Sequence, residues 1–175
     1  MPILSYHGAT PKISKDCFVA KTATIVGDVT LGEGSSVWFG ASLRTETVPI
    51  KIGARTNIQD NSSLHTDAEF PISIGEDVSI GHGAIIHGAV IGSNCLIGMG
   101  CILLNGCKIG NNCMLGAASL VLQGGEFPDD MLILGSPAKA RRPLTQDEID
   151  AITINAKHYY DFRAEYLATT TKESV

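Results

Sequence analysis

The sequence predicts an all-β solenoid of stacked parallel strands with one α-helix packed alongside it. Two observations lead to this prediction. Aliphatic residues recur every six positions between Ile13 and Val121, and from Thr145 onward the spacing changes to the threes and fours of an amphipathic helix. We therefore expect a solenoid domain over residues 1–140 and a linker, helix and tail over residues 141–175.

The six-residue period fits neither a helix nor a hairpin, but it suits short strands that each form one side of a triangular coil. Three such units complete one coil. The aliphatic side chain fills the interior, and a glycine often follows it at the corner. The repeated aliphatic residues are Ile13, Val19, Ile25, Leu31, Val37, Leu43, Ile52, Ile58, Leu64, Ile74, Ile80, Ile86, Ile91, Ile97, Leu103, Ile109, Leu115 and Val121.

The position four residues after each aliphatic residue is small or β-branched in most units, as a crowded corner requires. All five cysteines of the chain occupy this position: Cys17, Cys95, Cys101, Cys107 and Cys113. Their phase in the repeat predicts small buried hydrophobic side chains, not a disulfide framework or a metal site. A reducing compartment fits these free thiols best.

The composition excludes some classes of partner. A net charge of −5, with no dense run of Lys or Arg, argues against nucleic acid. No apolar stretch reaches the roughly 20 residues that span a bilayer, and the N-terminus lacks the pattern of a signal peptide. We expect a cytoplasmic protein with no membrane partner.

The C-terminal helix has its own start signal, because Thr145 and Glu148 form a T-x-x-E capping box. We expect its apolar face to pack against the outside of the solenoid. The residues predicted on that face are Ile149, Ile152, Ala156, Tyr159, Phe162 and Tyr166.

Two insertions interrupt the repeat, TETVP at 45–49 and TDAEFP at 66–71. Extra residues can only be expelled at corners, so both are predicted to be outward loops, where functional residues often lie. Both flank the histidine-containing part of the chain.

With the insertions looped out, Arg44, His65 and His87 each follow an aliphatic residue of one column. They are therefore expected on successive coils about 4.8 Å apart. His82 belongs instead to a corner, where it aligns with Asp60.

Two stacked imidazoles have two interpretations: separate surface residues, or a clamp for a metal ion. If identical copies pack side by side, His82 of one subunit can complete a three-histidine site begun by His65 and His87 of the next. Spacing alone leaves both interpretations open.

The segments NIQDNSSLH (57–65) and IGHGAIIHG (80–88) together resemble the gamma-class carbonic anhydrases, a family of hexapeptide-repeat proteins that fold as left-handed parallel β-helices. The resemblance extends to the LRTETVPIKIGARTNIQD block, the GSPAKARRPL segment and the final helix. It implies a homotrimer with the metal between subunits. The ligands would be His65 and His87 of one chain and His82 of its neighbour.

The resemblance also implies a reaction and a set of catalytic residues. Zinc, or iron or cobalt in its place, lowers the pKa of bound water to about 7, so that a metal-bound hydroxide can hydrate carbon dioxide to bicarbonate. Gln59 matches the residue that orients this hydroxide, and Tyr159 matches a tyrosine near the metal. Arg44 matches an arginine at the subunit contact, with Asp60 as its acidic partner across the interface; a purely structural ion pair is the simpler role for it.

Two features depart from the family pattern. Arg44 is followed by Thr45 and Glu46, where the family has Gly and Asp, and the TDAEFP loop is shorter than the acidic loops that export protons in the most active members. Hydration is therefore expected to be weak or absent even with the metal site intact. The alternatives are a metal-dependent esterase or thioesterase, a CoA-dependent acyltransferase, and a non-catalytic trimer held together by metal.

Overall fold

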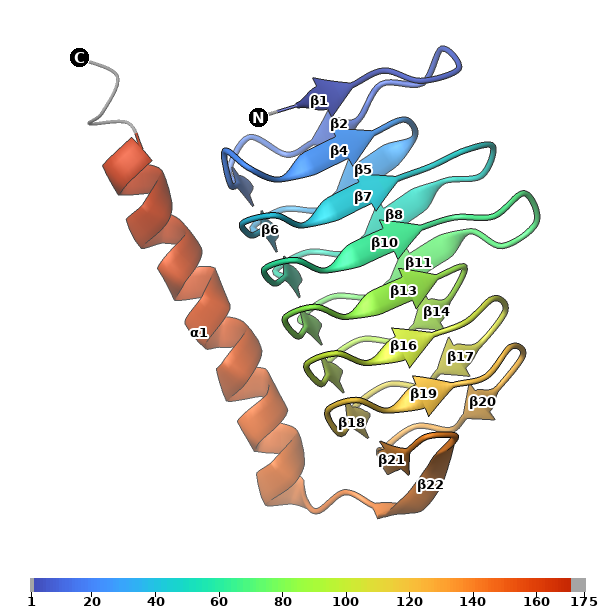
Figure 1. Ribbon diagram of the computed structural model, residues 1–175. Helices are drawn as coiled ribbons and strands as arrows, with labels where there is room; N and C mark the ends of the chain where they lie inside the picture. The colour runs from blue at the N-terminus through green and yellow to red at the C-terminus, as the bar shows by residue number, and fades with distance from the viewer. Residues whose placement is uncertain (1, 171–175) are drawn as a thin grey trace.

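The computed structural model describes residues 2–170 and shows a triangular prism of about seven coils with one long helix along its outside (Figure 1). Each coil contributes one strand to each of three sheets. This arrangement confirms the predicted all-β solenoid, a parallel β-helix with a C-terminal helix alongside. The end of the predicted tail, residues 171–175, lies outside the described residues.

Each of the three sheets forms one face of the prism. The histidine face contains β1 (Ile3–Leu4), β4 (Thr24–Val26), β7 (Ser42–Arg44), β10 (Ser63–His65), β13 (Ile85–His87), β16 (Ile102–Leu103) and β19 (Leu120–Val121). The lysine face contains β2 (Lys12–Ile13), β5 (Val29–Leu31), β8 (Ile50–Ile52), β11 (Ile72–Ile74), β14 (Val90–Ile91), β17 (Lys108–Ile109) and β20 (Glu126–Phe127). The helix face contains β3 (Phe18–Val19), β6 (Ser36–Val37), β9 (Asn57–Ile58), β12 (Ser79–Ile80), β15 (Leu96–Ile97), β18 (Met114–Leu115), β21 (Met131–Gly135) and β22 (Ala138–Pro143), and only its last strand pair is antiparallel.

The repeated aliphatic residues fill the prism, as the period predicts. Leu43, Leu64 and Ile86 lie side by side on successive coils and are fully buried. All five cysteines are buried free thiols, and burial raises the pKa of Cys107 to about 12. The Cys107 thiol therefore remains protonated at neutral pH, and the five buried cysteines act as packing residues.

Both insertions loop outward at the corner between the histidine face and the lysine face (Figure 1). The first joins β7 to β8 and the second joins β10 to β11. Asp67 and Phe70 close the second loop through a short antiparallel bridge. The strand registers on either side are undisturbed, so the loops leave the stacking of the coils intact.

Helix α1 (Gln146–Thr170) begins at the predicted capping box. The backbone N–H of Thr145 donates to Oε2 of Glu148 at 2.9 Å, and the N–H of Glu148 donates to Oγ1 of Thr145 at 3.3 Å. The helix lies across the helix face and buries Ile152 and Ala156 there. Within residues 2–170, no helix combines the length and the apolar character that a bilayer-spanning segment needs.

The prediction of the apolar face is partly wrong for the C-terminal half of α1. Phe162 is 37% exposed and Tyr166 is 39% exposed, whereas Arg163 is only 6% exposed. The reason is that an α-helix has 3.6 residues per turn. The buried stripe therefore continues from Ala156 to Arg163 and Leu167. The ring of Tyr166 still contacts Trp38, with centroids 5.0 Å apart.

Arg163 fastens the end of α1 to the first coils. Its guanidinium donates to the backbone carbonyl of Asp16 and lies 4.3 Å from the ring centroid of Tyr160. We expect Arg163→Met to lower the free energy of unfolding by about 1.5–3 kcal/mol, because a partly buried carbonyl loses a charged donor. Urea titration followed by circular dichroism measures this effect. Lys157→Met, on the exposed side of the same helix, should change stability by less than about 0.5 kcal/mol, and equal losses in the two variants would contradict the assignment.

Candidate functional site

The strand register brings the predicted column together on the histidine face. His65 of β10 pairs with Arg44 of β7 on one side and with His87 of β13 on the other. This confirms the predicted alignment of the three residues. Each side chain points outward because the residue before it, an aliphatic of the repeat, points into the prism.

The imidazoles of His65 and His87 converge. Nδ1 of His65 lies 3.0 Å from Nε2 of His87, and the ring centroids are 5.0 Å apart. Burial and the positive charge of Arg44 lower the pKa of His65 below its ordinary value, so its imidazole is neutral at neutral pH. Neutral imidazoles are the form that binds metal ions.

The outer nitrogens of both rings face acceptors. Nδ1 of His87 lies 2.6 Å from Oδ1 of Asn105. Nε2 of His65 is buried and lies 3.3 Å from Oε1 of Glu46, although it makes no hydrogen bond within the described residues. With its proton on Nδ1, His87 presents the lone pair of Nε2 to Nδ1 of His65, and these two inner nitrogens form one hydrogen bond when His65 carries its proton on Nδ1.

His82 lies elsewhere, at the corner where the sequence places it. Its Nδ1 is 3.0 Å from Oδ2 of Asp60, one coil away, and the backbone N–H of Gly83 donates to the Asp60 carbonyl oxygen at 2.9 Å. The imidazole is exposed. An acidic partner on Nδ1 leaves Nε2 of His82 directed outward as an available ligand.

Arg44 and Asp60 do not meet within one chain. The guanidinium of Arg44 pairs with Oε1 of Glu46 at 3.1 Å, and both side chains are about half exposed. Asp60 pairs with His82 instead. An ion pair between Arg44 and Asp60 of a neighbouring subunit therefore stays a prediction.

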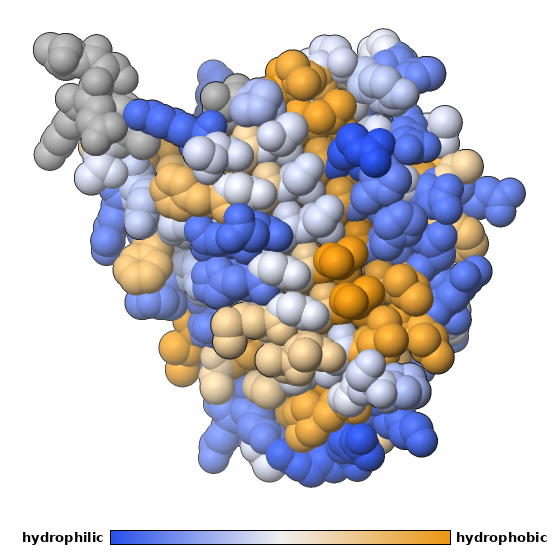
Figure 2. All heavy atoms as spheres, viewed as in Figure 1, coloured by the Kyte–Doolittle hydropathy of each residue, from blue (hydrophilic) through white to orange (hydrophobic). Residues whose placement is uncertain are grey.

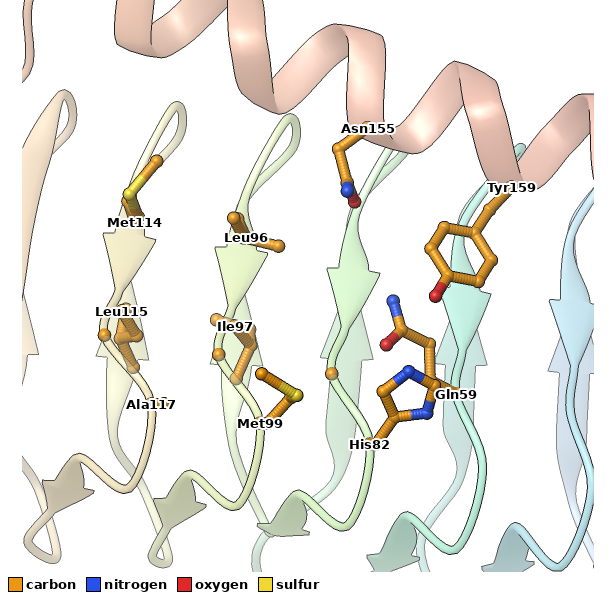
Figure 3. A pocket seen from close by; sticks show the side chains of 13 residues that line it. Gln59, His82, Leu96, Ile97, Met99, Met114, Leu115, Ala117, Asn155 and Tyr159 are labelled. Atoms are coloured by element: carbon orange, nitrogen blue, oxygen red, sulfur yellow. The ribbon is translucent and has the colours of Figure 1, made fainter.

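Gln59 is held by a buried polar network beneath α1. Its Nε2 donates to Oδ1 of Asn57 at 3.0 Å, and Nδ2 of Asn57 donates to Oγ of Ser79 at 2.9 Å. Among the described residues, Oε1 of Gln59 accepts no hydrogen bond, so this oxygen is available to a ligand. Gln59 lies between Tyr159 and His82 (Figure 3).

Tyr159 reaches the same place from α1. Its phenol ring packs edge-on against Trp38, with centroids 5.6 Å apart, and points toward Gln59 (Figure 3). Burial, and then the negative charge of Asp60, raise the pKa of the phenol above its ordinary value. Tyr159 therefore keeps its proton at neutral pH and can donate a hydrogen bond.

An apolar cavity of about 380 Å³ extends from these residues along the groove between α1 and the prism (Figure 3). Gln59, His82 and Tyr159 form its polar end. The remainder is lined mainly by side chains such as Leu96, Met99 and Met114. The cavity can hold a small apolar molecule beside these three polar groups and the side chain of Asn155, which also lines it.

The spacing of the two imidazoles fits a pair of ligands to one metal ion. Two nitrogen ligands of one tetrahedral zinc ion lie about 3.3 Å apart, since Zn–N bonds measure about 2.0–2.1 Å, and the two inner nitrogens lie 3.0 Å apart. Among the described residues of one chain, no three His, Cys, Asp or Glu side chains converge on a point that could hold a metal. A third ligand would therefore come from outside this set, and His82 of a second chain is the candidate that the sequence predicts.

Sequence reasoning missed two contributors, Asn105 and Asn57. Asn105 lies beside His87 because β16 pairs with β13 in a register that places residue 105 next to the end of that strand. The offset of this coil is 17 residues, so Asn105 aligns with Gly88, the residue directly after His87, and counting along the repeat would have placed it there. Nothing in the spacing distinguishes Asn57 from other outward residues on the helix face.

Comparisons with known proteins agree with this architecture. The family model for the bacterial transferase hexapeptide, described as six repeats, matches residues 71–103 and 88–123. A crystal structure from Bacillus cereus, titled as a putative acetyltransferase, has a TM-score of 0.94 and 38% identity and covers 95% of this chain and 97% of its own. That level of similarity exceeds what a shared fold alone produces.

Two relatives have names that bear on function. A probable carbonic anhydrase from Methanocaldococcus jannaschii is 50% identical over 147 residues, which cover 84% of this chain and 92% of that protein. Gamma carbonic anhydrase 2, mitochondrial, from Arabidopsis thaliana is 36% identical over 97% of this chain, and the chain spans 63% of the length of that relative. The chain therefore belongs to the gamma carbonic anhydrase-like family of hexapeptide-repeat proteins.

Proposed function

We propose that this protein is a metal-dependent carbonic anhydrase that hydrates carbon dioxide to bicarbonate at the interface between subunits of a homotrimer. The metal would be held by His65 and His87 of one subunit and by His82 of the next. The observation that carries the proposal is the convergence of the two imidazoles at 3.0 Å, with an acceptor on the outer nitrogen of His87. Metal-binding histidines almost always have such an acceptor on the second nitrogen.

The chemistry of the three faces supports subunit contact through the histidine face. The helix face is covered by α1, and the lysine face exposes Lys12, Lys51 and Lys108 to solvent. The later coils of the histidine face expose a group of aliphatic side chains, which we call the apolar patch (Figure 2). Its residues are Ile85, Ile102, Leu104, Leu120 and Leu122, of which Ile85 is 43% and Leu122 51% exposed. A contiguous exposed patch of this kind marks an interaction site.

The chain's own residues have separable roles in the proposed reaction. When bound, zinc, or iron or cobalt in its place, supplies Lewis-acid activation of water near neutral pH. Oε1 of Gln59 accepts a hydrogen bond from the reacting water and orients it, and the O–H of Tyr159 donates to an oxygen of the substrate. The apolar cavity admits carbon dioxide and excludes bulk water from it.

Metal analysis of the untagged protein, together with stopped-flow hydration of carbon dioxide, tests the proposal. We expect about one transition-metal ion per chain in the wild type. His82→Ala should lose most of that metal and reduce hydration to the buffer rate, because removing one of three ligands weakens binding by far more than the 10–100-fold typical of outer-shell changes. His158→Ala, an exposed histidine on α1, is the matched control and should keep both. A wild-type trimer without transition metal would overturn the proposal.

The cavity also favours one alternative electrophile, an ester or thioester with a short acyl group. Its apolar length beside His82 suits an acyl chain, and the same activated water would attack an acyl carbon. Nitrophenyl acetate and acetyl-CoA, assayed beside carbon dioxide on the same metallated preparation, separate the two. Faster turnover of an acyl substrate would assign hydrolysis, and the absence of all turnover would leave metal as a structural link.

A further inference from the structure

We propose that Asn105 is a positioning residue for the metal site, and that Asp67 in the TDAEFP loop fixes its orientation. The inference rests on the proposed function, because it concerns how His87 is prepared as a metal ligand. Asn105 would orient His87, and Asp67 would orient Asn105. It gives the short second insertion a role other than proton export.

The hydrogen-bond capacities of the three groups leave one arrangement. The carboxylate of Asp67 can only accept, so the nitrogen of the Asn105 amide must face it, and Nδ2 donates to Oδ2 of Asp67 at 3.2 Å. The amide oxygen of Asn105 is then turned toward His87, where it lies 2.6 Å from Nδ1. Since that oxygen can only accept, Nδ1 of His87 carries the proton and Nε2 presents its lone pair toward His65.

The local backbone is shaped to allow this contact. Gly88 has φ of +59°, and a Cβ atom there would lie 2.6 Å from Oδ1 of Asn105 and 2.5 Å from Cβ of Phe70. Any larger residue at position 88 would displace both the amide and the loop. Phe70 also lies over Gly106, the residue after Asn105, at 3.1 Å from where its Cβ would be. The loop thus packs against the turn that carries Asn105.

A neutral amide suits this position chemically. It holds the proton on Nδ1 without adding a negative charge beside a site that already includes Glu46 near His65. The charge of Asp67 is kept one residue further away, on an exposed loop. The relay runs from Asp67 through Asn105 to His87, and each member sets the orientation of the next.

Two readouts on one set of variants test the inference. The first is the His87 tautomer in the metal-free protein, from long-range ¹H–¹⁵N spectra of the imidazoles. The second is the zinc dissociation constant from chelator competition. Asn105→Leu removes the acceptor at similar volume, Asn105→Asp retains it, and Asp67→Asn allows the Asn105 amide to flip. Gln123→Leu is the matched control, because Gln123 holds the same turn position one coil further on and is exposed.

We expect the wild type to show His87 protonated on Nδ1, and Asn105→Leu to lose that preference and bind zinc about 10–100-fold more weakly. Asn105→Asp should restore the tautomer preference, since it keeps an acceptor for Nδ1 of His87 although it loses the donor to Asp67; Asp67→Asn should fall between, and Gln123→Leu should match the wild type. An unchanged tautomer and unchanged zinc affinity in Asn105→Leu would overturn the inference. If the wild type binds no zinc but the tautomer responds as expected, the proposed function fails while the positioning of His87 by Asn105 stands.

Discussion

Two variants that each lack metal should regain about one quarter of the wild-type metal when they are co-expressed in equal amounts. The first is His82→Ala, which keeps His65 and His87, and the second is the double variant His65→Ala/His87→Ala, which keeps His82. In a cyclic trimer with random assembly, about three quarters of the trimers are mixed, and each mixed trimer contains one complete interface out of three. Metal analysis of the purified mixture, referred to total chain, measures the recovery.

This result separates a shared site from any site within one chain. Each variant purified alone should contain almost no metal, and mixing the purified trimers without dissociation should restore nothing. Chromatography with light scattering verifies that both variants remain trimers. Substantial metal in His82→Ala alone would show that His65 and His87 suffice, and no recovery in co-expressed trimers would show that His82 of a neighbour does not complete the site.

The period of six made the fold and much of the geometry of the site predictable. Once Leu43, Leu64 and Ile86 are assigned to one interior column, the register of Arg44, His65 and His87 follows from counting, and the structure has that register. The same counting placed His82 beside Asp60. A solenoid permits this because neighbours in space are one coil apart in sequence, at a nearly constant separation.

The residues that escaped prediction depend on side-chain direction, which a period does not determine. Arg163 replaces Phe162 in the buried stripe because the stripe follows 3.6 residues per turn and Arg163 finds a carbonyl acceptor at Asp16. Asn105 is a turn residue by composition, and only its hydrogen bonds to His87 and Asp67 distinguish it from Gln123. Spacing shows which residues can meet, but the available donors and acceptors decide which of them do.

Leu122→Glu should disperse the trimer and release its metal, although Leu122 lies two coils, or about 10 Å, from His87. Leu104 follows His87 on the next coil and Leu122 follows Leu104, so all three share one outward column. If His82 of a neighbour reaches His87, the corner residues on the following coils of that neighbour face the same column. The first of these residues is Met99, one coil after His82. Met99 is 59% and Leu122 is 51% exposed in the single chain, as expected of surfaces that a second copy covers.

A carboxylate at position 122 would be buried without a partner, which costs several kcal/mol at each interface. A cost of that size weakens association by at least about a hundredfold, since each 1.4 kcal/mol is a factor of ten. Sedimentation at micromolar concentration, with metal analysis of each species, should therefore find folded, metal-free monomers.

Val90→Glu provides the comparison, because Val90 is an outward apolar residue with 41% exposure on the lysine face. That face carries the Lys108–Glu126 ion pair beside it and is expected to remain in solvent. Val90→Glu should leave the trimer and its metal content unchanged. If Leu122→Glu instead stays trimeric with full metal content, the apolar patch lies outside the subunit contact, and His82 would have to approach His65 and His87 from the coils above.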